Sequence, residues 1–524
     1  MSQDLGRRGF LGLTGASVAG AALGTGAFAP SGASANSRGG HGTRSVVVAT
    51  RSGRVRGVER SDGALVWKGM PYAAAPTGRR RFAPPQPAAS WTGVRDATEY
   101  GHAAPQVPLL PGLPETPNQS EDCLYLNVWS PSTTGKKPVI VWIHGGGFIA
   151  GTGNDPTFDG AQYVQRDCVV VTFNYRLGAF GSLYQPDRFG SGNLRLLDQM
   201  AALRWVRDNI AAFGGDPCAV TVMGESAGAM SIGALLGTPK ARGLFRRAVI
   251  QSGGPRPVHT AEFASATREA VKRSLGVSDA SRLTAVSTAE LLDASVQASN
   301  DPQLLEPFGH VIDGQVLPRH PLGAVDGSVD LLIGTCNMEI EPFMGSPVFP
   351  RRFETLARQA TGDRAWDRLL KVYGDTALPG HTTLNDVLSG WFVVMPSVWL
   401  AEYAHRAGAN VWQYTFDYAQ AGPFGPTHGS DVQYTFGNFG QGDFTGAAPA
   451  DLPTARALSS KMVDAFAAFA RHGSPSTRAL PNWPAFTPRH RACLSFDVEP
   501  RLVDDRLADA RREAWDGVDP FAVC

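Results

Sequence analysis

Short, nearly unbroken runs of hydrophobic residues recur along the chain. They are rich in β-branched side chains and occupy Pro138–Ile143, Cys168–Phe173, Ala219–Gly224, Arg247–Gln251, Asp330–Gly334 and Val411–Phe416. Runs of this kind are typical of strands in a sheet that is covered on both faces. We therefore expect these residues to form the centre of a buried sheet.

Segments with helical periodicity separate these runs. Between residues 197 and 213, hydrophobic side chains return every three or four positions, and Gly214 with Gly215 then ends the predicted helix. Strands that alternate with helices predict an α/β fold, with a mostly parallel, doubly wound central sheet flanked by helices. Residues 255–300 and 340–405 are also mainly helical in pattern, which predicts helical insertions over the sheet.

The composition is that of a globular protein. Hydrophobic residues make up 43% of the 524 positions and charged residues 18%, which is enough apolar material for a sizeable core. The 48 Lys and Arg residues balance 47 Asp and Glu residues, so the net charge is only +1. Because no strong field surrounds such a protein, we expect a small, roughly neutral partner rather than nucleic acid or an anionic membrane. No pattern in the sequence indicates an oligomeric state.

The first residues differ in character from the rest of the chain. Arg7 and Arg8 precede a weakly apolar run rich in Gly and Ala, which ends in a small-x-small pattern at Ala35. This pattern predicts an export signal of the twin-arginine type over residues 1–35, and hence a secreted protein. Gly and Thr interrupt the run throughout, so we expect no membrane anchor in the mature protein. Residues 36–524 are then expected to form a single domain.

One serine stands in unusually cramped surroundings. In the stretch MGESAGAMS, Ser226 follows a predicted strand, precedes a helix-like run and lies between Gly224 and Gly228. A sharp strand-to-helix turn strains a non-glycine residue at its apex, while glycines beside it lack the Cβ atoms that would clash with the crossing backbone. Such a turn, called a nucleophile elbow, holds the hydroxyl clear of the sheet. The motif alone is a weak signal. We predict that Ser226 is a nucleophile because the motif lies between a predicted strand and a predicted helix.

A serine hydroxyl becomes a good nucleophile only when a base takes its proton and an acid orients that base. The connection after the fifth predicted strand offers two carboxylates, Glu339 and Glu341, and the residues alone do not decide between them. Downstream, His428 lies in a Gly/Pro-rich loop beyond the last predicted strand, which is where a base is required. His381 is its rival for this role.

A glycine-rich loop follows the first predicted strand in the stretch WIHGGGF. Backbone amides of glycine can approach a ligand closely, so this loop is a candidate source of donors to the oxyanion of a tetrahedral intermediate. It lacks the GK[ST] ending and the GxGxxG spacing of phosphate-binding loops. His144 in this loop has no second residue at metal-ligand spacing, and none of the six cysteines forms a CxxC pair. We expect neither a metal nor a cofactor.

These stretches together resemble the type-B carboxylesterases of the α/β-hydrolase fold, a family that includes para-nitrobenzyl esterases, cholinesterases and the inactive neuroligins. The resemblance runs in order from about Val46 to the C-terminus, and it is carried by stretches such as SEDCLYLNVW, PVIVWIHGGGF, NYRLGAFG, VTVMGESAG, VIDGQVLP and HGSDVQYTFG. It implies a serine carboxylesterase that hydrolyses small-molecule esters through an acyl-enzyme intermediate.

The resemblance also implies roles for individual residues. It implies a catalytic triad of Ser226, Glu339 and His428. At further positions it implies backbone amides that hold the oxyanion (Gly146, Gly147 and Ala227), a buried supporting network (Glu225 and Ser252) and a structural ion pair (Arg81 with Glu121).

The chain departs from the family pattern at three places. The residues that usually flank the acid are replaced on both sides, so Glu341 stays an alternative to Glu339. The position that usually pairs with Cys123 is Ala104, so the first disulfide of the family is not expected. The loop before the SEDC stretch has no Trp, so the aromatic platform that binds choline by cation–π attraction is missing.

Two other functions stay open. The same triad can act on amides, carbamates or lactones, and the sequence does not separate these bonds from esters. A non-catalytic binding protein of the neuroligin kind is the second alternative. The presence of Ser226, His428 and a candidate acid argues against it.

Overall fold

The computed structural model describes residues 44–522, with gaps at residues 110–112, 188–190, 302–303, 305, 345–348, 379, 422–424 and 441–448. Residues 43–524 form one compact unit. The predicted export signal, residues 1–35, lies outside the described residues and stays a prediction.

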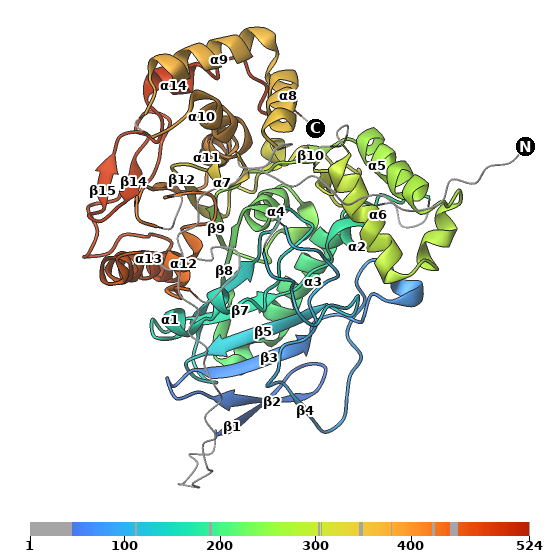
Figure 1. Ribbon diagram of the computed structural model, residues 1–524. Helices are drawn as coiled ribbons and strands as arrows, with labels where there is room; N and C mark the ends of the chain where they lie inside the picture. Colours follow the sequence, from blue (N-terminus) through green and yellow to red (C-terminus); the bar gives the residue numbers. More distant parts are fainter. Residues whose placement is uncertain are drawn as a thin grey trace, which may run out of the picture. The chain divides into compact units, whose positions relative to one another are not determined.

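In the described part of the chain, thirteen strands form one large sheet (Figure 1). From one edge to the other, the strands are β1 (Ser45–Ala49), β2 (Arg54–Glu59), β3 (Leu65–Pro71), β5 (Tyr125–Ser130), β7 (Val169–Phe173), β6 (Lys137–Ile143), β8 (Gly215–Glu225), β9 (Arg247–Gln251), β12 (Asp330–Cys336), β13 (Val411–Phe416), β14 (Cys493–Phe496) and β15 (Arg501–Val503), and β4 (Val94–Asp96) pairs with β2. Neighbours from β7 to β14 run parallel, while β1, β2, β3 and β5 at one edge and β15 at the other pair antiparallel. A separate parallel pair joins β10 (Val258–His259) to β11 (His310–Val311).

Helices cover both faces of the large sheet. One face carries α3 (Leu194–Asn209), α4 (Ala227–Leu236) and α11 (Met395–Ala407), and the other carries α1 (Ala161–Val164), α12 (Val432–Phe436) and α13 (Leu452–His472). Successive side chains of a strand point to opposite faces. In β6, Val139 and Val141 accordingly join the first core, and Ile140 and Trp142 join the second. This two-sided burial explains why the central strands read as unbroken hydrophobic runs.

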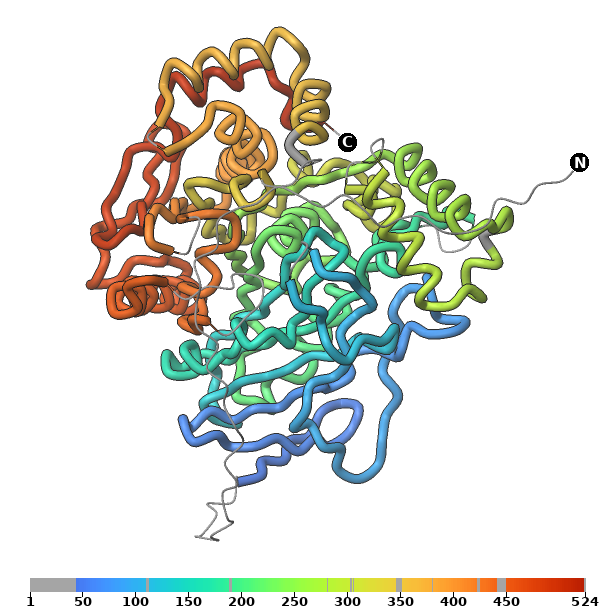
Figure 2. Tube along the Cα trace, in the orientation of Figure 1, coloured from blue at the N-terminus to red at the C-terminus, as the bar shows by residue number. Residues whose placement is uncertain are grey.

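Two groups of helices are inserted between the strands, as the helical pattern of residues 255–300 and 340–405 predicts. They are α5 (Ala261–Ser274) and α6 (Thr288–Asn300) in one group, and α7 (Glu341–Met344), α8 (Phe349–Thr361), α9 (Asp363–Asp375) and α10 (Thr383–Ser389) in the other. Figure 2 shows α5 and α6 in yellow-green and α8 to α10 in orange. A π-helical turn, Gly390–Val394, joins α10 to α11. The continuous helical run Thr383–Ala407 is long and apolar enough to cross a membrane, but 83% of its most apolar window is buried inside the protein.

The remaining helices are short. They are α2 (Gly178–Ser182), α14 (Asp509–Glu513) and the 3-10 turns Gly78–Arg80, Pro156–Phe158, Ile210–Phe213, Pro239–Ala241, Ala280–Thr284 and Pro321–Ala324. The turn Ile210–Phe213 continues α3, and Gly214 with φ 81° ends it, which confirms the helix end predicted at this glycine.

All six strands predicted from hydrophobic runs are confirmed, as β6, β7, β8, β9, β12 and β13. The hydrophobic runs did not predict the strands toward the edges, from β1 to β5 and β14 and β15. Because β8, β12 and β13 run parallel, the connections that follow them leave the same edge of the sheet. Those connections carry Ser226, Glu339 and His428.

Candidate active site

Ser226 is the apex of a sharp turn between β8 and α4. Its φ of 52° and ψ of −125° belong to neither element, and only 8% of the residue is exposed. A Cβ atom on Gly228 would lie 2.0 Å from the carbonyl oxygen of Ile143, and one on Gly224 would lie 2.8 Å from the same oxygen. Both positions therefore need glycine so that the chain can bend beside β6. The turn has the geometry of the predicted nucleophile elbow.

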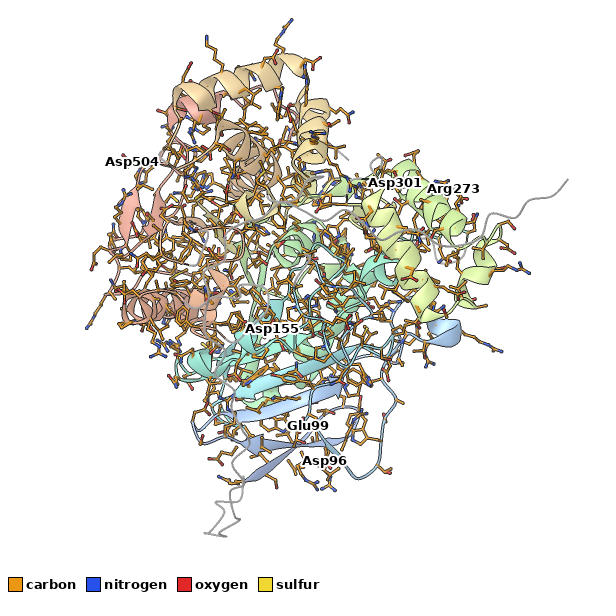
Figure 3. All side chains as sticks on the ribbon, viewed as in Figure 1. Asp96, Glu99, Asp155, Arg273, Asp301 and Asp504 are labelled. Atoms are coloured by element: carbon orange, nitrogen blue, oxygen red, sulfur yellow. The ribbon has the colours of Figure 1, made fainter. Side chains whose placement is uncertain are left out.

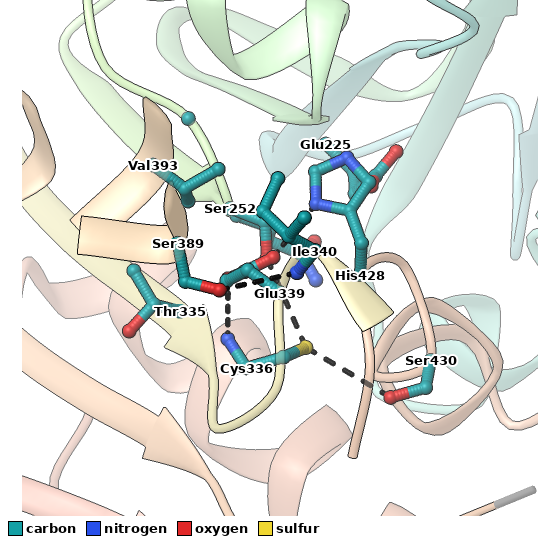
Figure 4. Close-up of polar contacts among 12 residues, drawn as sticks. Glu225, Ser252, Thr335, Cys336, Glu339, Ile340, Ser389, Val393, His428 and Ser430 are labelled. Carbon is teal, nitrogen blue, oxygen red and sulfur yellow. Dashed lines mark hydrogen bonds and ion pairs between the residues drawn. The ribbon is translucent and has the colours of Figure 1, made fainter. Parts of the chain in front are cut away.

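His428 and Glu339 are buried in direct contact (Figure 4). The Nδ1 atom of His428 lies 2.7 Å from Oε2 of Glu339, and Oε1 of Glu339 accepts a hydrogen bond of 2.6 Å from the backbone amide of Cys336. His428 lies between β13 and α12, and Glu339 lies three residues after β12. The segments that follow the neighbouring strands β13 and β12 thus hold the ring of His428 and the carboxylate of Glu339.

The rival candidates have other partners. Glu341 begins α7, and its carboxylate accepts a hydrogen bond from the side-chain amide of Asn385. His381 lies just before α10, and its Nδ1 atom is 2.6 Å from Oδ1 of Asp386, which belongs to that helix. Of the alternatives that the sequence left open, the structure brings Glu339 to His428 and holds Glu341 and His381 elsewhere.

Glu225 lies on the opposite side of the His428 ring. Its Oε1 atom is 3.3 Å from Nε2 of His428, and both side chains are 3% exposed. Since Glu225 directly precedes Ser226, this contact brings Nε2 of His428 to the elbow. Burial raises the pKa of Glu225 to about 8. Burial also disfavours the charged imidazole, but the carboxylates of Glu225 and Glu339 outweigh it and raise the pKa of His428.

A second layer of polar groups lies behind the acid and the base. Ser252, predicted as a supporting residue, donates through Oγ to Sγ of Cys336 at 3.8 Å, and within the described residues it forms no hydrogen bond with His428. Asp431 is fully buried, and its Oδ2 atom accepts hydrogen bonds from Gln251 (3.0 Å) and Tyr414 (2.8 Å). Cys336 and Asp431 were not singled out from the sequence. Asp431 is the last residue of the HGSD motif, and this motif is the signal in the sequence that could have identified it.

The glycine loop packs directly against the elbow. A Cβ atom on Gly145 would lie 3.1 Å from Cβ of Ser226 and 2.6 Å from Oε2 of Glu225. Gly146 and Gly147 have φ angles of 106° and 58°, which favour glycine. Among the residues that the structure describes, no acceptor binds the backbone amides of Gly146, Gly147 or Ala227. These amides are the three predicted oxyanion donors.

His144 is a structural residue of this loop. Its ring stacks on Tyr175 at a centroid distance of 4.2 Å, and its Nδ1 lies 2.9 Å from the carbonyl oxygen of Gly145. Burial lowers its pKa to about 4. Within the described residues, no cluster of three or more His, Cys, Asp or Glu residues has the arrangement of a metal site.

A cavity of about 510 Å³ opens beside the glycine loop. Gly145, Gly146 and Glu225 are among its lining residues. Its walls are mostly apolar and aromatic, and include Tyr100, Leu109, Leu113, Trp142 and Phe158. Asp155, labelled in Figure 3, belongs to the wall, where its carboxylate accepts a hydrogen bond of 2.8 Å from the amide of Thr157. No Lys or Arg is among the described lining residues, so the cavity suits a largely apolar group and does not favour an anionic one.

Two structural expectations concern residues outside this cavity. Arg81 and Glu121 form a buried, two-pronged ion pair, with Nε of Arg81 2.8 Å from Oε2 of Glu121. The same guanidinium donates to the carbonyl oxygen of Val286, which ties the segment before β5 to the loop before α6. Cys123 is fully buried and its thiol is free.

Comparisons with known proteins agree with this geometry. The sequence pattern of the carboxylesterase family matches residues 44–515. The chain is 39% identical to the para-nitrobenzyl esterase of Bacillus subtilis (strain 168), covering 90% of this chain and 98% of the relative. It is 36% identical to the phenmedipham hydrolase of Pseudarthrobacter oxydans, covering 86% of this chain and 94% of the relative.

Solved structures extend the same relationship to the fold. A carboxylesterase of Geobacillus stearothermophilus superposes with a TM-score of 0.80 at 38% identity, covering 90% of this chain and 100% of that one. A thermophilic para-nitrobenzyl esterase superposes with a TM-score of 0.81 at 36% identity, covering 89% and 99%. The chain therefore belongs to the carboxylesterase family, and it is a serine hydrolase of carboxylic esters with the α/β-hydrolase fold.

Proposed function

We propose that this enzyme hydrolyses esters through an acyl-enzyme on Ser226. His428 takes the proton of the Ser226 hydroxyl while Oγ bonds to the ester carbonyl carbon. When the tetrahedral intermediate collapses, the bond to the alcohol oxygen breaks and His428 gives that oxygen its proton. A water molecule then attacks the acyl-enzyme with His428 again as base, which releases the acid and restores Ser226.

Glu339 and the three free amides supply the electrostatic part of the mechanism. Glu339 accepts from Nδ1 of His428, so Nε2 is left to exchange the proton, and the carboxylate stabilises the imidazolium that forms. The amides of Gly146, Gly147 and Ala227 take the carbonyl oxygen as it becomes negative. Loss of one such donor in a serine hydrolase costs about 10²–10³ in turnover.

The cavity indicates the kind of alcohol that leaves. His428 must protonate the leaving oxygen, and its Nε2 lies 3.3 Å from Oε1 of Glu225, which is one of the residues that line the cavity. We therefore assign the cavity to the alcohol side of the ester. Its mostly apolar and aromatic walls suit an aryl or alkyl alcohol. The loop before the SEDC stretch contributes Leu109 and Leu113 to the lining and has no Trp that could bind choline by cation–π attraction. Phenyl or benzyl acetate should be hydrolysed with a higher kcat/KM than acetylcholine, and the reverse order would refute this assignment.

The observation that carries the proposal is the position of His428, with Nδ1 on Glu339 and Nε2 at the elbow. The direct test is Ser226→Ala assayed with p-nitrophenyl acetate, for which we expect a loss of turnover of about 10⁴-fold or more. Ser231→Ala is the matched control, because this buried hydroxyl on α4 contacts Gln199 and lies outside the triad. Wild-type turnover in Ser226→Ala would refute the mechanism.

Two further measurements test the proposal against the alternatives of a binding protein and of another bond type. A fluorophosphonate should add its mass to Ser226 in the folded protein, and absence of this adduct would favour a non-catalytic binding protein. A panel of matched esters, anilides, carbamates and lactones should give the highest kcat/KM for the esters. A higher value for another bond type would move the natural substrate to that class.

We also propose that residues 1–35 direct export. The paired Arg7 and Arg8 before a weakly apolar run support this assignment. Replacing both with Lys should keep the esterase activity inside the producing cell, whereas the wild-type chain delivers it to the medium. Equal secretion of both chains would contradict a twin-arginine signal.

A further inference from the structure

Among the residues that the structure describes, Arg195 is a buried cation without a carboxylate partner. It is the second residue of α3 and is only 1% exposed. Its guanidinium donates to Oγ of Ser182 (2.7 Å) and to the carbonyl oxygen of Phe308 (2.9 Å), and Nε has no acceptor. Within the described residues, no acidic side chain forms a salt bridge with it. Its first-turn position on a helix is also unfavourable for a positive charge.

The nearest carboxylate on the same helix is already engaged. Asp198 accepts two hydrogen bonds from the guanidinium of Arg176, at 2.6 and 2.7 Å. Burial accordingly lowers the pKa of Arg195 to about 10, which still leaves it charged at neutral pH. A buried, unpaired charge is costly, and an apolar side chain of similar size is often more stable at such a site. The charge therefore calls for an explanation other than stability.

The guanidinium of Arg195 lies over the aromatic ring of Phe148, at the end of the glycine loop. The central carbon of Arg195 is 4.0 Å from the centroid of the Phe148 ring. Phe148 directly follows Gly147, is fully buried and has a positive φ of 65°. Such a cation–π contact is strongest where water is excluded, as it is here.

Phe148 connects the two halves of the oxyanion site. Its ring belongs to one small hydrophobic cluster with Ala227 and Met230 of α4. Its carbonyl oxygen accepts a hydrogen bond of 2.8 Å from the amide of Gly178. The residue is thus held by its backbone on one side and packs with its ring against the helix that supplies the third amide. The packing of this ring therefore links the loop that carries the amides of Gly146 and Gly147 to the helix that carries the amide of Ala227.

We propose that Arg195 is a positioning residue that fixes the oxyanion site through Phe148. The cation–π contact holds the ring against α4, so that the amides of Gly146 and Gly147 keep their spacing from that of Ala227. The inference rests on the proposed oxyanion role of these amides. Arg195 itself touches neither the ester nor the triad.

The test compares Arg195→Met and Arg195→Lys with the wild-type enzyme. In Arg195→Met we expect kcat for p-nitrophenyl acetate to fall by about tenfold or more, with KM little changed, because a misplaced donor acts only in the transition state. The inhibition constant of a trifluoromethyl ketone, which adds to the serine and forms an oxyanion, should rise by a similar factor. The unfluorinated ketone should bind as before. Lysine, which keeps the charge, should recover part of the loss.

If Arg195 only stabilised the fold, Arg195→Met would lower the thermal midpoint, and we expect the opposite. The thermal midpoint of Arg195→Met should equal or exceed that of the wild type, because an unpaired buried charge is removed. Arg247→Met is the matched control, since Arg247 is a buried arginine of β9 whose Nε is also unpaired and which donates to the carbonyl oxygen of Ala470. We expect its kcat per titrated active site to be unchanged.

A double-mutant cycle completes the test. In a Phe148→Leu background the ring is absent, so Arg195→Met should cost little further activity. Wild-type kcat and ketone binding in Arg195→Met, or fully additive losses in the cycle, would overturn the inference. Such a result would leave the proposed mechanism intact as long as Ser226→Ala is inactive and the fluorophosphonate labels Ser226.

Discussion

Two glutamates contact the two ring nitrogens of His428, and their surroundings differ. Each oxygen of Glu339 accepts a hydrogen bond, one from the ring and one from the amide of Cys336. Glu225 lies 3.3 Å from the other nitrogen, and its Oε1 atom has no aligned donor among the described residues. Burial raises the pKa of Glu225 to about 8, so it holds a proton to higher pH than an exposed glutamate. The same side chain type thus serves two purposes, because hydrogen-bond donors reach both oxygens of Glu339, whereas Oε1 of Glu225 has none among the described residues.

The largest effect should come from the well-bonded carboxylate. Glu339→Gln places an amide where Nδ1 of His428 needs an acceptor, so the ring loses its correct tautomer, and we expect kcat to fall by about 10³–10⁴. The measurement is turnover of p-nitrophenyl acetate per titrated active site. Glu341→Gln is the control and should stay within about twofold of the wild type. Equal losses in both variants would return Glu341 to the role of the acid.

The sequence pattern alone could not predict which of two glutamates, Glu339 or Glu341, contacts His428. Glu339 and Glu341 lie two residues apart after the same strand, and nothing in their spacing decides which one meets His428. The decision comes from the backbone of the loop, which turns the amide of Cys336 toward Glu339 and starts α7 at Glu341. The family resemblance favoured Glu339, and the geometry agrees with it.

The strands of the sheet differ in the same way in how well the sequence predicts them. The six central strands were predicted because both of their faces are buried, which gives unbroken hydrophobic runs. A strand such as β2, with the sequence RVRGVE, alternates buried Val55 and Gly57 with more exposed neighbours, so it carries no such run. Strands β14 and β15 have only four and three residues, too few for any periodicity to appear. Their pairing depends on long-range contacts that local patterns do not contain.

The poorly bonded carboxylate should have a smaller effect on rate and a clear one on pH. An ionised Glu225 favours the protonated imidazole, which cannot act as a base. In Glu225→Gln the pKa of His428 should therefore fall, and the acidic limb of the kcat/KM profile should move to lower pH. At the plateau we expect kcat to drop by no more than about tenfold. An acidic limb that stays in place would show that the two groups are not coupled.

The same pair makes stability depend on pH. Burial raises the pKa of Glu225 to about 8, and the neighbouring carboxylates raise the pKa of His428, so each group holds its proton to higher pH in the folded state than in the unfolded state. The free energy of unfolding should then decrease as pH rises from about 5 to about 9. Urea unfolding at several pH values should give a shallower decrease in Glu225→Gln, by roughly 1–2 kcal/mol over the range. An identical slope in both proteins would contradict the contribution of Glu225.

The smallest effect should come from a third carboxylate in the same region. Asp431 is as buried as Glu339, but it contacts Gln251 and Tyr414 instead of the His428 ring and acts on the ring only through its charge. Asp431→Asn keeps one acceptor oxygen, which can serve both donors as Oδ2 does now, so kcat at the plateau should change by less than about threefold. The acidic limb should move in the same direction as in Glu225→Gln and by a smaller amount. If the shift in Asp431→Asn were the larger one, direct contact with the ring would not be what separates the two glutamates from the other acids around His428.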